Sequence, residues 1–419
     1  MYHWYKFLTY LFYPFAKIFL LIRKIKKKEH INRYKEKISI IKKQRGDGCL
    51  VWFHAASVGE CLSILPLIQE LSKNAKVNKI LVTSVTLSSA KVLQNKMGHN
   101  KKIVHQFLPL DIPNYVNKFL NHWSPDLSIF IYSELCPNLI FQIKKKKIPL
   151  LLINGRITKK SFYRWKYLNS FAREIFKKFD LCLSSSKESE NYLKILGAKN
   201  VKNHGNLKFS GLGRKLNDKL NSNFLNKLEN RKIWCAASTH FSEEIFCGKV
   251  HLSLNKHYKN ALLIIIPRHI NRIAEIKKDL SNLNLNVILY TDISQINNET
   301  DVLLVDTYGD APKFFEISKN VFLGGSLINH GGQNPIEASR LGCKIFHGPH
   351  INNFSEIYAL LKSLMVSNEV NSQNELCQAL VNDFENKNQE TSQIINKINS
   401  HGEAVLNNVM KEIKVYINI

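Results

Sequence analysis

The feature that most constrains the fold is a regular alternation along the chain between short apolar runs and longer stretches with helical spacing. Continuous apolar runs are typical of strands buried on both faces, and helices are the usual connections between parallel strands. The alternation therefore predicts an α/β protein built on parallel sheets. In the first half, the predicted strands are residues 49–54, 80–84, 127–132, 150–154 and 181–184, with weaker support for 102–107.

The alternation stops in a polar stretch with several glycines, residues 205–231, and then starts again. A chain of 419 residues is also too long for one ordinary core. We therefore predict two Rossmann-like domains facing each other across a cleft, which is a preferred place for a ligand. The predicted strands of the second half are 232–237, 261–267, 286–290, 302–306, 320–324 and 344–346, and the predicted divisions are 1–30, 31–210 and 211–419, the last ending in closing helices.

The first 30 residues differ from the rest of the chain. Residues 4–22 are mostly Phe, Leu, Tyr and Ile, interrupted by Lys6, Pro14 and Lys17, and a basic cluster follows at 23–28. A spanning helix needs about 20 apolar residues. A cleaved signal is disfavoured, because the charges follow the apolar run and no small-residue cleavage site is present. We predict a membrane anchor, either spanning or lying in the interface, whose basic flank keeps the remaining chain on the cytoplasmic side and attracts anionic lipid.

The net charge is +27, from 60 Lys and Arg against 33 Asp and Glu. A general bias of composition toward Lys explains part of this excess, and the rest indicates an anionic partner: a nucleic acid, a membrane surface or a phosphorylated substrate. A membrane-tethered nucleic-acid-binding protein is disfavoured, because the chain has no known binding motif and no aromatics interleaved on a basic face. The eight cysteines are scattered without a C-x-x-C pair, which predicts reduced thiols rather than a disulfide frame or a zinc site.

Glu60 lies where the predicted strand 49–54 is followed, after a turn of small residues, by a helical pattern. Ligands of open parallel sheets bind beyond the carboxyl ends of strands. A carboxylate in the first turn of a helix also caps free N–H groups, so a catalytic carboxylate and a structural cap are alternatives. The helix start is expected to lower the pKa of Glu60, so a base here would need the substrate or a closing second domain to desolvate it. Glu134, Arg156 and Lys208 follow other predicted strands.

A glycine-rich stretch, residues 324–337, follows a predicted strand of the second half and leads to Pro335, which suits the first position of a helix. Glycines allow a phosphate to approach the backbone, and a helix start offers it free N–H groups. Glu337, one turn further, is placed to accept hydrogen bonds from ribose hydroxyls. The alternative is an ordinary glycine-rich turn. We favour nucleotide binding, because four glycines in nine residues accompany this carboxylate.

Arg268 and His269 follow the strongest apolar run of the second half, residues 261–267. An Arg at the carboxyl end of a strand is placed to clamp a phosphate with its planar guanidinium group. Residues 306–310 end another predicted strand and are expected to line the same nucleotide. Residues 238–244, which include two adjacent glutamates, are typical of a helix cap, and for them we favour the structural role.

Several common motifs are missing from the sequence. No G-x-G-x-x-G follows a strand, which disfavours NAD, and no G-x-x-x-x-G-K-[ST] is present, which disfavours a P-loop kinase. No D-x-D pair is available to hold a metal beside a sugar nucleotide. His347 and His350 are separated by Gly-Pro, which indicates a loop rather than a metal site. The sequence predicts neither a metal nor a cofactor.

Taken together, these motifs resemble the 3-deoxy-D-manno-octulosonic acid (Kdo) transferases, which modify the lipid A precursor. The matching residues occur in the family's order and cover most of the chain from 52 to 338. They are Ser57-Val58-Gly59-Glu60, Glu134-Leu135 with Pro137-Asn138, Asn154 with Arg156, Gly205-Asn206-Leu207-Lys208, Ala237-Ser238-Thr239-His240 with Glu243-Glu244, Pro267-Arg268-His269 with Arg272, Gly324-Gly325-Ser326-Leu327, and His330-Gly331-Gly332 with Asn334-Pro335 and Glu337.

The resemblance implies a GT-B fold and an inverting, metal-independent transfer of Kdo from CMP-Kdo to a sugar hydroxyl of the lipid A precursor, lipid IVA. It implies lipopolysaccharide biosynthesis on the cytoplasmic side of the inner membrane. It also implies Glu60 as the general base, with Glu134 and Lys208 as stabilisers of the transition state. The implied CMP site consists of Arg268, His269, Gly309, Asp310, Ala311, Asn334, Pro335, Ile336 and Glu337.

Three places depart from the family's pattern. Cys136 stands where the family usually has Trp, Gly155 where it has Ala, and Asp310-Ala311 where it has Glu-Leu. The last change shortens a carboxylate and removes an apolar contact beside the expected nucleotide. Another GT-B sugar-nucleotide transferase or an epimerase is the alternative function, which would share residues 324–337 without needing residues 57–60.

Overall fold

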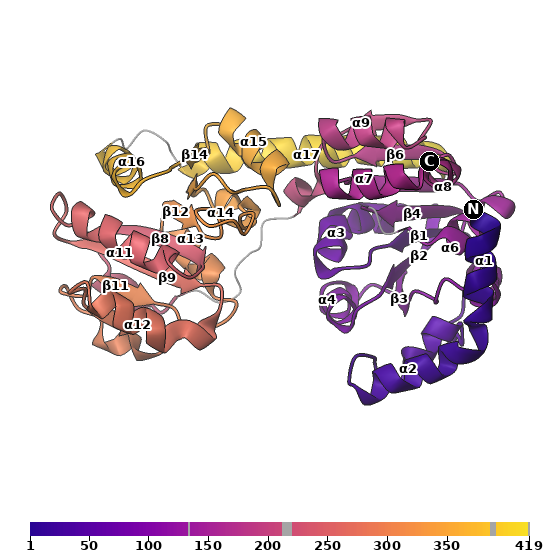
Figure 1. Cartoon of the computed structure of the whole chain (residues 1–419), viewed down its shortest axis with the longest axis horizontal. Helices are drawn as coiled ribbons and strands as arrows, with labels where there is room; N and C mark the ends of the chain where they lie inside the picture. The colour runs from indigo at the N-terminus through magenta and orange to yellow at the C-terminus, as the bar shows by residue number, and fades with distance from the viewer. Residues whose placement is uncertain (133–134, 212–219, 386–390, 418–419) are drawn as a thin grey trace. The chain divides into compact units, whose positions relative to one another are not determined.

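The computed structural model describes residues 1–132, 135–211, 220–385 and 391–417 (Figure 1). The chain divides into two compact units: unit 1 comprises residues 1–212 and 401–419, and unit 2 comprises residues 213–400. Among the described residues, each unit contains a parallel sheet of seven strands with helices between the strands. The predicted α/β class and the two parallel-sheet domains are confirmed.

The sheet of unit 1 has the strand order β3-β2-β1-β4-β5-β6-β7, and neighbouring strands are parallel. Side chains of β1 alternate between two cores: Trp52 packs on one face of the sheet, whereas Val51 and Phe53 pack on the other. Burial on both faces explains the continuous apolar runs. The elements are β1 (Cys49–His54), α3 (Val58–Lys73), β2 (Val77–Ser84), α4 (Leu87–Met97), β3 (Ile103–Phe107), α5 (Pro113–Trp123), β4 (Leu127–Ile131), α6 (Pro137–Lys145), β5 (Leu150–Gly155), α7 (Lys159–Tyr167), α8 (Asn169–Phe176), β6 (Leu181–Ser184), α9 (Lys187–Ile195), β7 (Val201–Asn203) and η3 (Leu207–Ser210).

The sheet of unit 2 has the order β10-β11-β9-β8-β12-β13-β14, again with parallel neighbours. Trp234 on β8 and Phe322 on β12 belong to its core. The elements are α10 (Ser222–Lys227), β8 (Lys232–Thr239), α11 (Glu243–Leu254), β9 (Ala261–Pro267), η4 (Ile270–Arg272), α12 (Ile273–Ser281), β10 (Val287–Leu289), η5 (Tyr290–Gln295), β11 (Val302–Leu304), α13 (Ala311–Ile317), β12 (Asn320–Leu323), α14 (Ile336–Arg340), β13 (Lys344–His347), α15 (Ser355–Ser363), β14 (Ser367–Glu369) and α16 (Gln373–Glu385).

Both sheets reverse their strand order beside the first strand. In unit 1 the chain moves outward from β1 through β2 to β3 and then returns to β4, on the other side of β1. In unit 2 the same reversal places β12 on the other side of β8. Crevices at the carboxyl ends of strands, where the order reverses, are the usual ligand sites of such sheets. The topology therefore points to the loops after β1 and β4 and to those after β8 and β12.

The predicted strands are confirmed, with ends that differ by a few residues. The sequence analysis did not predict β7 and β14, because these outer strands are only 3 residues long and partly exposed. The predicted linker at residues 205–231 begins in unit 1 with η3 and ends in unit 2 with α10.

The end of the chain corrects the predicted division of domains. The sequence analysis assigned all of 211–419 to the second domain, but residues 401–419 belong to unit 1. Helix α17 (Thr391–Tyr416) buries Val405, Val409 and Ile413 in the core of unit 1, and Glu412 pairs with Lys202 at 2.8 Å. An apolar stripe with helical spacing identifies a buried face, but not which sheet covers it.

The first 25 residues form α1 (Tyr2–Leu11), η1 (Tyr13–Phe15) and α2 (Ala16–Ile25), which pack on unit 1. Ala16 and Leu20 are buried in a small cluster with Ile112 and Tyr115, and the Tyr5 hydroxyl donates to Asp111 at 2.9 Å. Among the described residues, no single helix has the length and apolar character to cross a membrane. The pair 2–11 and 13–25, bent by 43°, meets that test when taken together.

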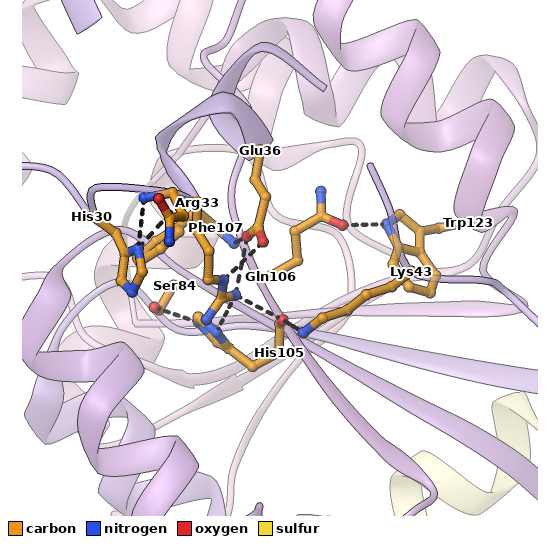
Figure 2. A network of polar contacts seen from close by, with 10 residues as sticks. His30, Arg33, Glu36, Lys43, Ser84, His105, Gln106, Phe107 and Trp123 are labelled. Atoms are coloured by element: carbon orange, nitrogen blue, oxygen red, sulfur yellow. Dashed lines mark hydrogen bonds and ion pairs between the residues drawn. The ribbon is translucent and has the colours of Figure 1, made fainter. Parts of the chain in front are cut away.

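The segment after these helices covers the outer edge of the first sheet (Figure 2). Arg33 and Lys43 donate to the backbone carbonyl of His105 on β3 at 3.0 and 2.6 Å, and the Phe107 N–H donates to Glu36 at 2.8 Å. Side chains thus satisfy backbone groups of an edge strand that would otherwise offer them to another chain. Burial, followed by the charges of Arg33 and Lys43, lowers the pKa of His105 to about 3.

Candidate active site

Glu60 occupies the third residue of α3, directly beyond the carboxyl end of β1. Ser57 is the N-cap of this helix, and its hydroxyl donates to one oxygen of Glu60 at 3.0 Å. The N–H of Ala56 donates to the other oxygen at 2.8 Å. Glu60 therefore makes the contacts of a structural cap, which was one of the two roles predicted for it. Its side chain nevertheless stays half-exposed, so a substrate can reach it.

The pKa of Glu60 lies above its ordinary value. Burial is the largest cause and raises it, while the hydrogen bonds from Ala56 and Ser57 and the charge of Lys208 lower it by less. The sequence analysis expected the helix start to lower this pKa, but the pKa is raised, because burial outweighs every lowering contribution. A raised pKa brings a carboxylate closer to the range in which a general base works best.

Lys208 is held near Glu60 by backbone contacts around η3. Asn206 accepts from the Lys208 N–H at 3.0 Å, and Asn154 accepts from the Leu207 N–H at 3.1 Å. Asn154, the next-to-last residue of β5, has a φ of 54°, a left-handed conformation that turns its side chain amide to this loop. The Lys208 ammonium lies 5.4 Å from the ring centroid of Tyr132. The structure thus places Lys208, the predicted lysine, close enough to Glu60, the predicted base, for its charge to lower the pKa of Glu60.

Glu134, the other predicted stabiliser, lies outside the described residues. The described chain stops before it at Tyr132 and resumes at Leu135. At the start of α6, the Asn138 and Leu139 N–H groups donate to Asp111 at 3.0 and 2.9 Å. Burial raises the pKa of Asp111 to about 6.

Three N–H groups near the start of the 324–337 stretch are not free to bind a phosphate, whereas nucleotide binding by the stretch as a whole stays a prediction. The N–H groups of Gly325, Ser326 and Leu327 donate to the Glu243 carboxylate at 2.7, 3.1 and 3.0 Å, and the His240 N–H donates to it at 2.9 Å. These donors are therefore already satisfied inside the protein. A Cβ on Gly324 would lie 2.6 Å from the Ser238 carbonyl oxygen, so this glycine serves the close packing of the two loops.

The second part of that stretch begins a short helix. Asn334 is exposed and accepts from the Ile336 N–H at 3.2 Å. Pro335 was predicted as the first residue of the helix, but it is the N-cap, and α14 begins one residue later. Ile336 is buried and Glu337 is exposed. Of the four residues predicted here, Asn334 and Glu337 therefore present polar side chains to solvent.

Gly309, Asp310 and Ala311 lead into α13, which lies beside α14. Gly309 has a φ of 90°, with open space around its Cβ position. Asp310 pairs with Lys313 at 2.8 Å and accepts from the Thr307 hydroxyl. Burial would raise the pKa of Asp310, but these two contacts lower it on balance. The carboxylate of Asp310, which stands where the family usually has Glu, is thus bound by residues of its own loop and of the first turn of α13.

Arg268 and His269 follow β9 and are exposed, as a phosphate site requires. The Arg268 N–H donates to the Thr239 carbonyl at 2.9 Å, which places it beside the end of β8. The sequence analysis missed that the His240 ring lies between those of His269 and His330 here, because it treated residues 238–244 as a cap only. A histidine within two residues of the end of each of two strands was the available signal. The described residues contain no group of three His, Cys, Asp or Glu side chains able to hold a metal ion.

Two parallel α/β units with charged side chains at the ends of their central strands are consistent with the GT-B architecture of glycosyltransferases. Residues 31–211 match the sequence profile of the family described as 3-Deoxy-D-manno-octulosonic-acid transferase (kdotransferase). The 3-deoxy-D-manno-octulosonic acid transferase of Rickettsia bellii is 35% identical over 84% of this chain and 84% of its own length. That of Haemophilus influenzae is 31% identical over 77% of this chain and 76% of its own length.

The chain therefore belongs to the 3-deoxy-D-manno-octulosonic acid (Kdo) transferase family and is a glycosyltransferase. Among solved structures, a putative UDP-N-acetylglucosamine 2-epimerase from Listeria monocytogenes matches with a TM-score of 0.60. The match covers 89% of this chain and 97% of that one at 14% identity. This likeness shows a shared fold and nothing about the substrate.

Proposed function

We propose that this protein transfers Kdo from CMP-Kdo to a sugar hydroxyl of the lipid A precursor, lipid IVA, in lipopolysaccharide biosynthesis, with inversion and without a metal. The observation that carries the proposal is Glu60: a half-buried carboxylate with a raised pKa, at the carboxyl end of the central strand β1, beside a lysine. Membership of the Kdo transferase family supports the identity of the sugar.

In this reaction Glu60 accepts the proton of the acceptor hydroxyl as the new glycosidic bond forms. A sugar hydroxyl is a weak nucleophile, and proton removal by a positioned carboxylate is typically worth about 10²–10⁴ in rate. Lys208 stabilises the negative charge that develops during transfer, and Glu134 shares this task by the family resemblance. The charge of Lys208 lowers the pKa of Glu60 and so favours its ionised form.

Unit 2 holds the donor in this proposal. Arg268 and His269 bind the phosphate of CMP, whose charge grows as the sugar departs. Residues 309–311 and 334–337 line the rest of the nucleotide, and the exposed Glu337 is placed to accept from ribose hydroxyls. Because the Gly325 to Leu327 amides are occupied by Glu243, the side chains of this unit, rather than that loop, provide the phosphate contacts.

We further propose that the first 25 residues attach the protein to the cytoplasmic face of the inner membrane by lying in the interface. One face of the helix pair is docked on unit 1 through Tyr5 and Leu20. The opposite stripe is exposed and apolar at helical spacing, and Lys24 and residues 26–28 follow it. An apolar stripe flanked by basic residues suits an anionic lipid surface. The stripe consists of Trp4, Leu8, Leu11, Phe15, Ile18 and Ile22.

Incubation of the purified protein with CMP-Kdo and lipid IVA, followed by mass analysis of the lipid, tests the reaction. We expect the acceptor to gain the mass of Kdo, in a buffer containing a chelator as well as without it. Folded protein that leaves the acceptor unchanged would overturn the proposal. Membrane attachment is tested with the double variant Leu8→Glu and Phe15→Glu, which is expected to release the protein from membranes. The control is Gln94→Glu with Asn95→Glu, at exposed positions of α4, which makes the same change in charge and should leave the protein attached.

A further inference from the structure

Three histidines from the loops after three adjacent strands lie together in unit 2, with the His240 ring between the other two. His240 follows β8, His269 follows β9, and His330 lies in the loop after β12; the strands are neighbours in the order β9-β8-β12. The ring centroids of His240 and His330 are 4.2 Å apart, and those of His240 and His269 are 5.7 Å apart. The cluster therefore sits at the point where the strand order of this sheet reverses, the usual place for a ligand.

The surrounding loops hold the rings together. The Gln333 amide nitrogen lies 3.2 Å from Nε2 of His240. Asn353 donates from its side chain to the His330 carbonyl at 3.1 Å. A Cβ on Gly325 would lie 3.2 Å from the His330 ring and 3.3 Å from the His240 ring, so a larger residue there would push the rings apart. The close approach of the two imidazoles thus depends on a glycine.

The electrostatic setting of the cluster favours an anion. Glu243 accepts four backbone N–H groups and Glu244 accepts from Arg272 at 3.1 Å, so both nearby carboxylates are already engaged. Burial is the largest cause of the low pKa of His240, about 4, and the charges of His330, His269, Arg268 and Arg272 add to it. A phosphate placed over these cations would reverse that repulsion and favour protonated imidazole.

We propose that His240, His269 and His330 together bind the phosphate of the donor nucleotide, and that the cluster takes up a proton from solvent as the phosphate binds. This inference rests on the proposed donor, but it adds His240 and His330 to the site and predicts a proton exchange that the transfer reaction does not require. Positive charge gathered in this way would also stabilise CMP as it leaves.

Calorimetric titration of the full-length protein with CMP at pH 8 tests the inference, in two buffers with different ionisation enthalpies. The second pKa of a phosphate monoester is about 6, so CMP is dianionic at this pH and its own titration cannot take up a proton on binding to cations. We expect binding with uptake of a fraction of a proton. His330→Asn, at an exposed position, is expected to weaken binding about tenfold and to reduce the uptake.

The matched control is His257→Asn, which changes an exposed histidine of the same unit outside the cluster. It should leave the affinity and the uptake unchanged. CMP binding without proton uptake, or with an uptake that survives His330→Asn and His240→Gln, would overturn this inference and leave the proposed function standing. Failure of the folded wild-type protein to bind CMP at all would overturn both.

Discussion

Two glutamates at equivalent places in the two units have opposite surroundings. Glu60 and Glu243 each stand in the first turn of the helix that follows the first strand of their sheet, α3 after β1 and α11 after β8. Glu243 is 1% exposed and its two oxygens accept four backbone N–H groups. Glu60 is half-exposed and accepts one N–H and one hydroxyl.

The comparison separates a structural carboxylate from the one that we propose as the base. A carboxylate that satisfies four buried donors is fully engaged, because each donor would lose a hydrogen bond if the group turned to a substrate. Glu60 keeps room for another partner, and its raised pKa makes it a better proton acceptor than an ordinary exposed glutamate. The same strand-to-helix pattern therefore leaves a carboxylate accessible in unit 1 and uses one for loop packing in unit 2.

The largest expected effect comes from Glu60→Gln. Loss of the proposed base should lower the rate of Kdo transfer by about 10²–10⁴, while CMP binding stays unchanged, because the proposed donor site belongs to unit 2. Initial rates measured by mass analysis of the lipid product, with calorimetry for CMP, check this. Glu70→Gln, at an exposed position of the same helix, serves as the control. Near-normal transfer by folded Glu60→Gln would remove the distinction between the two glutamates.

Glu243→Gln should act on stability instead. The amide nitrogen replaces one carboxylate oxygen and then faces N–H groups that need an acceptor, so we expect unfolding of unit 2 to become easier by about 2–4 kcal/mol. Denaturant unfolding of the full chain measures the change in midpoint. Glu375→Gln is the control, because this carboxylate accepts one exposed N–H, from Asn371. Equal midpoints for the two variants would contradict the structural role of Glu243.

Ser57→Ala is expected to have the smallest effect. It removes the N-cap of α3, at a cost of about 1 kcal/mol. It also removes a hydrogen bond that lowers the pKa of Glu60, so that pKa rises further. Because the base must be ionised, the acid limb of the pH–rate profile should move to higher pH, with little change in rate above it.

The raised pKa of Glu60 also fixes how its contribution to folding stability depends on pH. A folded-state pKa above the unfolded value favours the protonated form, so this contribution to stability is present at low pH and is lost as the pH rises through the folded-state pKa. Thr86→Ala removes the comparable cap of α4 without touching a glutamate. It should cost similar stability and leave the pH–rate profile in place; an equal shift in both variants would refute the link to Glu60.

Much of the fold could be predicted from the sequence, because strands buried on both faces are continuous apolar runs. Both parallel sheets, the end of β1 at His54 and the position of Glu60 at a helix start were all readable in this way. The motifs also led to Arg268 and His269, which follow a strand-like run, and to Lys208, which lies at the start of the predicted linker. Local patterns were sufficient for these features, because strands and helix starts depend mainly on residues that are close together in the chain.

Other features depended on contacts between distant residues. The stripe of Val405 and Ile413 has helical spacing, but only packing against the first sheet assigns it to unit 1. The N–H groups of Gly325 to Leu327 have no acceptor nearby in the sequence, but in the structure they donate to Glu243, more than eighty residues earlier. The raised pKa of Glu60 likewise arises from burial, which a local pattern does not contain. The sequence by itself determined the strands, the helix starts and the family, whereas the tertiary structure decided which of two similar glutamates stays open to a substrate, because hydrogen-bond donors and burial come from other parts of the chain.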